Sequence, residues 1–188
     1  MSFSTLPVAV TRRIDEAHKN ITRSIKVLKT ALKSKSWRQI ENAVELIILK
    51  LLDSHNPDAL FALTPSKRLE RELFVQFGGM QLLLEVLEPP LSKPDARDMP
   101  PSQIQRHVEL WNEVLVLLRE VCFAAPSLAD CVFSDQHLVF LFTLLSHDFV
   151  FENTMSLLEE VLAVRQEAFC LRLVPNLYDL LGSFSTRR

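Results

Sequence analysis

HLVFLFTLLSHDFVFENTMSLLEEVLAV, residues 137–164, is the stretch that decides the fold. It holds two Leu-rich segments, and we expect helices over residues 136–145 and 151–164. No run in the chain alternates apolar and polar residues for long enough to predict a sheet. Helices this apolar are unstable alone and need neighbouring helices to bury them. The stretch therefore predicts a packed array of short helices.

An internal repeat supports that array. Three apolar segments look alike, and they read FGGMQLLLEVL from Phe77, FSDQHLVFLFTLL from Phe133 and LRLVPNLYDLLGSF from Leu171. Aligning their closing apolar pairs also aligns Met80, Leu138 and Val174, at offsets of 58 and 36 residues. Without a proline-rich insert of about a dozen residues, the first offset falls within the ~40–47-residue period of armadillo and HEAT units. We predict an all-α fold, an armadillo/HEAT-like right-handed helical solenoid segment, with an unrelated helical bundle as the alternative.

The first long helix is expected over residues 6–32. Its apolar residues recur every three or four positions and predict one buried stripe, made of Val10, Ile14, Ala17, Ile21, Ile25, Leu28 and Leu32. Ser36 is expected to cap the next helix through its hydroxyl, and Gly78-Gly79 to end a later one. Further helices are expected over residues 67–77, 80–88, 101–125, 127–133, 166–171 and 175–184. We assign residues 1–36 to a basic amphipathic helix, 37–184 to the array with a Pro-rich loop at 89–101, and 185–188 to a tail.

Charge is distributed unevenly along the chain. The formal net charge is −2 over 188 residues, so the total indicates no nucleic-acid or membrane partner. Residues 11–38 hold nine basic and two acidic residues, which is +7, and residues 109–160 hold nine acidic residues and one arginine, which is −8. The cations of the first helix fall opposite its apolar stripe, and the candidate partner-binding residues are Arg12, Lys19, Arg23, Lys26 and Lys33. A merely solvated face is the alternative interpretation.

Signatures of catalysis and of metal or cofactor binding are missing from the sequence. GxSxG, GxxxxGK[ST], GxGxxG and HExxH do not occur, and the five histidines show no zinc-ligand spacing. Cys122, Cys131 and Cys170 lack CxxC spacing and lie in apolar helical context, which predicts buried thiols and a reducing compartment. Trp37, Trp111 and Tyr178 are expected in the core rather than on a nucleic-acid-binding surface. We expect no enzyme activity, no cofactor and no small-molecule substrate.

The amino terminus, MSFSTLPVAV, lacks the basic and long apolar regions of a signal peptide. No apolar run approaches the length that spans a bilayer. We therefore expect a cytoplasmic protein without direct membrane insertion.

Several blocks resemble the short transient receptor potential channel 4-associated proteins, also called TRUSS. The carriers are ALFALTPSKRL from Ala59, the FGGMQLLLEVL block, and HLVFLFTLLSHDFVFENTMSLLEEVLAVRQE followed by VPNLYDLLGSF. The resemblance covers residues 37–184, departs in the Pro-rich loop and is weaker over residues 1–36. These blocks are mostly apolar positions, so they support a common fold better than common partners.

The resemblance implies a substrate receptor of a cullin-4 RING ubiquitin ligase, docked through the damaged-DNA-binding adaptor and recognising degradation clients. Members of the family are several times longer than this chain. We expect a non-catalytic scaffold that acts by proximity. One alternative is a signalling scaffold that tethers TNF receptor or TRP calcium channels to cytosolic effectors. The other is a structural capping segment of a longer solenoid.

Overall fold

The computed structural model describes residues 8–52, 65–88, 101–124 and 132–186, and it divides into two compact units, residues 1–82 and 83–188. Every regular element in these ranges is helical, so the all-α prediction is confirmed for them. The first unit holds α1 (Val8–Ser34), α2 (Trp37–Leu51) and α3 (Pro65–Gln76), and α4 (Gly79–Leu87) crosses the boundary. The second holds α5 (Pro101–Ala124), α7 (Asp135–Leu144), η3 (Asp148–Val150), α8 (Phe151–Val164), η4 (Leu171–Leu173) and α9 (Leu177–Thr186).

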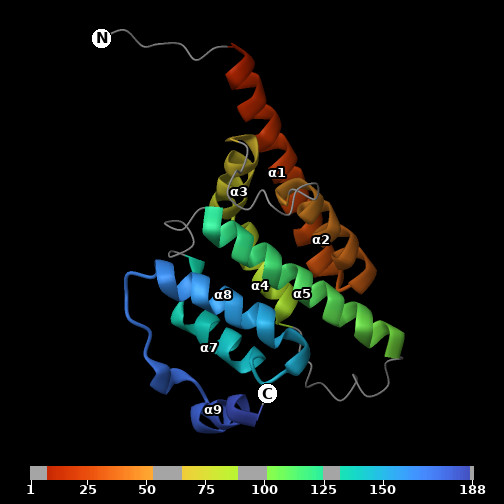
Figure 1. Cartoon of the computed structure of the whole chain (residues 1–188). Helices are drawn as coiled ribbons and strands as arrows, with labels where there is room; N and C mark the ends of the chain where they lie inside the picture. The colour runs from red at the N-terminus through yellow and green to blue at the C-terminus, as the bar shows by residue number, and fades with distance from the viewer. Residues whose placement is uncertain (1–7, 53–64, 89–100, 125–131, 187–188) are drawn as a thin grey trace. The chain divides into compact units, whose positions relative to one another are not determined.

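In the first unit, α1 packs against both α2 and α3 (Figure 1). Its buried side carries large and small residues at helical spacing: Ala17, Ile21, Ser24, Leu28 and Ala31. Ser24 is tolerated there because its hydroxyl donates to the Asn20 carbonyl at 3.0 Å. Of the predicted stripe, Ala17, Ile21 and Leu28 are buried, and Ile25 and Leu32 are half-buried. The α1 helix ends two residues later than expected.

The turn between α1 and α2 is only two residues long. Lys35 adopts the left-handed conformation, with φ of 53°, and Ser36 is the N-cap of α2. The Ser36 hydroxyl makes no cap hydrogen bond, so that detail of the prediction is wrong. Instead the Ser36 amide donates to the Ser34 hydroxyl at 3.3 Å, because the tight turn brings the end of α1 within reach.

Two cations of α3 bind the carboxyl end of α2. The Arg71 side chain is buried, and its Nε donates to the Leu51 carbonyl at 2.9 Å. The Lys67 ammonium donates to the neighbouring Lys50 carbonyl. The last carbonyls of a helix lack intrahelical partners and carry the negative end of its dipole. Arg71 and Lys67 therefore satisfy these groups and fix α3 against α2.

Gly78 and Gly79 connect α3 to α4 for two different reasons. Gly78 has φ of 77°, a conformation that favours glycine and that ends α3 as predicted. At Gly79, a Cβ atom would overlap the ring of Phe74, which is fully buried. The first glycine is required by the backbone and the second by packing.

The second unit is built around α8, which packs between α5 and α7 (Figure 1). The facing residues are fully or nearly fully buried, and they include Leu115, Leu118, Val121, Leu138, Leu141, Leu157 and Val161. Burying one such side chain stabilises the fold by about 1.5–3 kcal/mol. The predicted helices 136–145 and 151–164 are confirmed within one residue at each end.

The chain leaves helical structure after α8, and the helix predicted over residues 166–171 is wrong. Arg165 reaches the start of α7 instead, where its guanidinium donates to the Phe133 carbonyl, just before the helix, at 3.2 Å and to the Asp135 carboxylate at 2.8 Å. The Phe169 ring stacks on Phe142 of α7, with centroids 5.5 Å apart. These contacts between distant residues outweigh the local helical preference. Cys170 is consequently exposed and outside any α-helix, contrary to prediction.

Two of the three segments of the predicted repeat share a burial pattern. Met80 and Leu138 are fully buried, as are Leu83 and Leu141. In the third copy Val174 is buried, but Tyr178 is 89% exposed, so its predicted place in the core is wrong. Trp111 is buried as expected, and Trp37 is half-buried. The predictions for residues 89–100 and most of 127–133, and for Cys131, lie outside the described residues.

Gly79 and Gly182 offer a matched pair of substitutions. We expect Gly79→Ala to lower the free energy of unfolding by about 1–3 kcal/mol, because the added methyl group overlaps the buried Phe74 ring. Gly182→Ala in α9 meets no atom within 4 Å, and we expect it to be neutral or to stabilise by up to about 1 kcal/mol. Urea denaturation followed by circular dichroism measures both. Equal effects of the two substitutions would contradict this account of Gly79.

Candidate protein-binding surface

The solvent-facing side of α1 carries the five cations singled out from the sequence. Each of them is exposed, and they are Arg12, Lys19, Arg23, Lys26 and Lys33. Their spacings are 7, 4, 3 and 7 residues, so they form one stripe along the helix, opposite the buried side. Among the described residues, none of the five forms an ion pair. The stripe therefore presents charge that no carboxylate of the described fold neutralises.

The apolar side of α1 is not fully covered. Val10 and Ile14 were expected in the buried stripe, but they are 39% and 37% exposed. They lie in the first turns of α1, before the first buried residue, Ala17. The amino-terminal end of the helix thus shows both apolar and basic residues to solvent, which is the composition of a docking helix.

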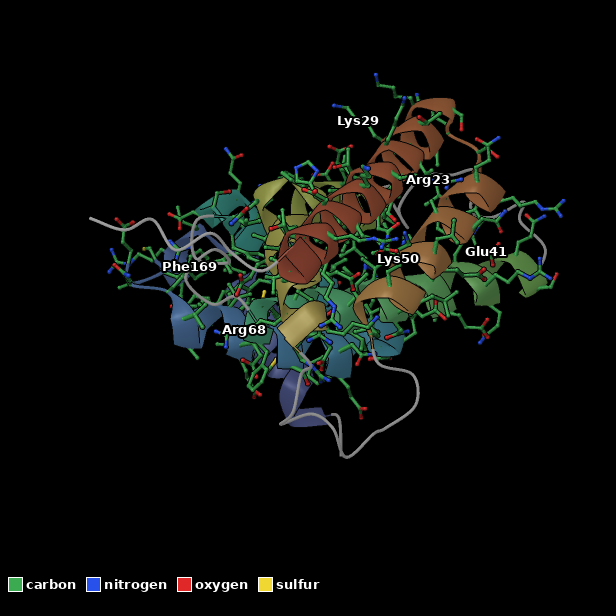
Figure 2. All side chains as sticks on the ribbon, turned by 90° about the horizontal axis from the view of Figure 1, so that it is seen from above. Arg23, Lys29, Glu41, Lys50, Arg68 and Phe169 are labelled. Atoms are coloured by element: carbon green, nitrogen blue, oxygen red, sulfur yellow. The ribbon has the colours of Figure 1, made fainter. Side chains whose placement is uncertain are left out.

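A groove of about 400 Å³ runs between α1 and α2. It is lined by Lys26, Val27, Thr30, Ala31, Gln39 and Asn42. Val27 is 40% exposed, and Leu46, one turn beyond Asn42 on α2, is 48% exposed. In the view from above, Arg23 and Lys50 lie between α1 and α2, whereas Lys29 points away from α2 (Figure 2). The groove therefore joins exposed apolar residues to part of the cationic stripe.

Sequence reasoning did not identify this groove. Leu46 and Leu49 of α2 are 48% and 66% exposed and fall outside the buried stripe of that helix. Two leucines off the apolar stripe of an amphipathic helix were the available signal. Their relation to Val27 depends on the register between α1 and α2, which the local sequence pattern does not fix.

Three of the described histidines contact residues of the packed helices or their ends. His137 forms a capping box with Ser134 at the start of α7, where its Nδ1 accepts from the Ser134 amide at 3.2 Å. His18 contacts Phe77 edge-on, with ring centroids 4.8 Å apart. His147 stacks on Phe149, and burial lowers its pKa despite the opposing effect of the Asp148 carboxylate. These rings contribute to helix ends and packing.

Cys122 and Cys170 lie in opposite environments. Cys122 is fully buried on α5, and burial, assisted by the Glu160 carboxylate, raises the pKa of its thiol to about 12. A thiol held protonated is a poor nucleophile. Cys170 is exposed. Within the described ranges no three His, Cys, Asp or Glu side chains are placed to hold a metal ion, and no described helix is long and apolar enough to cross a membrane.

Two curated relatives are similar to this chain. The short transient receptor potential channel 4-associated protein of Homo sapiens is 27% identical over 139 residues, which cover 70% of this chain and 17% of the human protein. The protein of the same name from Mus musculus is 28% identical over 117 residues, 62% of this chain and 14% of the mouse protein. These similarities support a distant relationship, and the chain spans less than a fifth of either relative's length. No protein-family model and no solved structure matches the chain.

The two described cysteines give a direct test of the packing around α5. In a Cys131→Ser background, we expect Cys170 to react rapidly with Ellman's reagent at pH 8. We expect Cys122 to react only on unfolding. Its raised pKa leaves about a thousandfold less thiolate than an ordinary cysteine has, and burial blocks access of the reagent. Replacing Cys170 by Ser should abolish the rapid phase. A rapid phase that persists in this variant would show that Cys122 is accessible.

Proposed function

We propose that this chain is a non-catalytic scaffold that binds other proteins through the solvent-facing side of α1. The observation that carries the proposal is the stripe of exposed, unneutralised cations opposite a tightly packed face. The packed face fixes the helix, so the stripe is presented as a preformed surface, which lowers the entropic cost of binding. Such charges steer an acidic partner and help to select it.

The mechanism requires no bond chemistry in this chain. A scaffold acts by holding two bound proteins near each other, which raises their effective concentration. Short apolar helices stacked as an armadillo-like, right-handed solenoid would suit this role, because each unit adds outer surface to one continuous array. The shared burial of Met80 with Leu138 and of Leu83 with Leu141 supports such stacking.

The finer assignment rests on the family resemblance. It proposes a cytoplasmic substrate-receptor module of a cullin-4 RING ubiquitin ligase, in which α1 contacts the ligase adaptor or a degradation client. A second candidate follows from the names of the relatives, which describe association with short transient receptor potential channel 4. In that role the chain would tether a channel or receptor tail to effectors. The two candidates predict different co-purifying proteins.

The proposal predicts that reversing charges on the stripe lowers partner recovery. We expect the triple variant Arg12→Glu, Lys19→Glu, Lys33→Glu to recover at least about tenfold less of its main partners, because three attractive charges become repulsive. The measurement is affinity purification with quantitative mass spectrometry from cells that express the tagged chain. Enrichment of cullin-4 components supports the ligase assignment, and enrichment of channel or receptor proteins supports the second candidate.

A matched control separates position from net charge. Arg38→Glu, Arg106→Glu, Arg172→Glu changes the same number of exposed cations, and we expect it to retain partner recovery. Both triple variants should keep thermal midpoints within a few degrees of the parent chain, since exposed substitutions rarely change stability much. Equal recovery by the two variants would refute the role of the stripe.

A further inference from the structure

The groove between α1 and α2 has a surface that the described residues leave open to solvent. Its lining takes Val27 and Ala31 from α1 and Gln39 and Asn42 from α2. Ala31 is 3% exposed and closes the bottom of the groove, whereas Val27 is 40% exposed and faces its opening. Small and aliphatic residues at these positions make a shallow trough that another side chain can enter.

The register of the two helices extends this trough beyond the cavity itself. The Lys50 ammonium of α2 donates to the Asn20 carbonyl of α1 at 3.4 Å, so α2 runs antiparallel to α1 along this length. Leu46 lies one turn after Asn42 and one turn before Lys50. It is therefore placed on the side of α2 that faces the groove, and it lengthens the apolar surface by a further turn.

Cations border the trough on both sides. Arg23 and Lys26 come from α1 and Lys50 comes from α2, and none of the three is ion-paired within the described part of the chain. Figure 2 shows Arg23 and Lys50 between the two helices, with Glu41 on the side of α2 away from α1. The border therefore favours anionic groups on an occupant that covers the apolar centre.

We propose that this groove is a docking site for an acidic amphipathic helix from another protein. Its apolar side would cover Val27 and Leu46, and carboxylates on both flanks would meet Arg23, Lys26 and Lys50. A helix fits because the groove between two antiparallel helices is straight and accepts a third at the usual spacing of about 8–10 Å. This inference rests on the proposed scaffold function and names its site and partner class.

The chemistry of the groove favours a protein over a nucleic acid. Single-stranded nucleic acids stack their bases on aromatic side chains, and the lining residues include none. A duplex would contact the cations through its phosphates and leave Val27 and Leu46 in water. An acidic amphipathic helix uses both the charges and the apolar centre.

The test uses the full chain and a designed probe. The probe is an 18-residue fluorescent peptide with Leu at helical spacing on one side and Glu on the others, and the control peptide has the same composition in scrambled order. Fluorescence anisotropy should show at least about tenfold tighter binding of the patterned peptide. The double substitution Val27→Ser, Leu46→Ser leaves every cation in place, and we expect it to weaken binding about tenfold. Arg23→Glu, Lys26→Glu should weaken it at least as much.

Matched controls lie outside the groove. Leu162 is 40% exposed on α8 and Arg106 is exposed on α5, so Leu162→Ser and Arg106→Glu should leave peptide binding unchanged. Equal affinity for the patterned and scrambled peptides would overturn the inference, as would full binding by the Val27→Ser, Leu46→Ser variant. Stronger competition by a DNA duplex than by unlabelled peptide would identify a nucleic-acid surface instead. Self-association of the chain that these substitutions abolish would identify a second copy as the occupant.

This design separates the inference from the proposed function. The triple variant at Arg12, Lys19 and Lys33 leaves the groove intact, and the Val27→Ser, Leu46→Ser variant leaves the stripe intact. Loss of cellular partners in the first variant together with failed peptide binding by the parent chain would refute the groove and retain the scaffold. Peptide binding by the parent chain, together with unchanged cellular partners in the triple variant, would retain the groove and refute the scaffold role of the stripe.

Discussion

An apolar helix face must be covered, and in both units the cover is another helix. α1 is buried against α2 and α3, and α8 is buried between α5 and α7. Each helix supplies part of its neighbour's core, so none of these faces is available for recognition. Recognition is left to the opposite sides and to the lines where two helices meet. The cationic stripe and the groove beside it are one instance of each.

Helices were predictable from the sequence because their signal is local. Apolar residues spaced by three or four positions located α5, α7 and α8, and the end of α1, to within about two residues. The failures occur where distant residues decide the conformation. The segment after α8 has a helical sequence pattern. Its residues 166–170 are nevertheless not helical, because Arg165 and Phe169 contact residues of α7. The Ser36 cap failed for a local reason, because the Gln39 amide, which a capping hydroxyl could accept from, donates to the Ser36 carbonyl at 3.0 Å.

The candidate site also has one part that the local sequence pattern predicted and one part that it did not. Periodicity placed the five cations on one side of α1, and the structure leaves all of them exposed, although their role stays a prediction. Periodicity could not reveal the groove, because Val27 and Leu46 share it only through the register of two helices. Tyr178 shows the complementary failure. Its place among apolar residues predicted burial, but residues 177–186 form a helix that leaves this ring in solvent.

The cations at the end of α2 have a practical consequence for protein engineering. Arg71 and Lys67 bind the last carbonyls of that helix directly, so the relative placement of α2 and α3 is set by side chains. Replacing Arg71 would leave the Leu51 carbonyl without this donor inside the packed unit, at a cost of about 1–3 kcal/mol. Position 71 is therefore one to keep unchanged when the surface of this unit is redesigned.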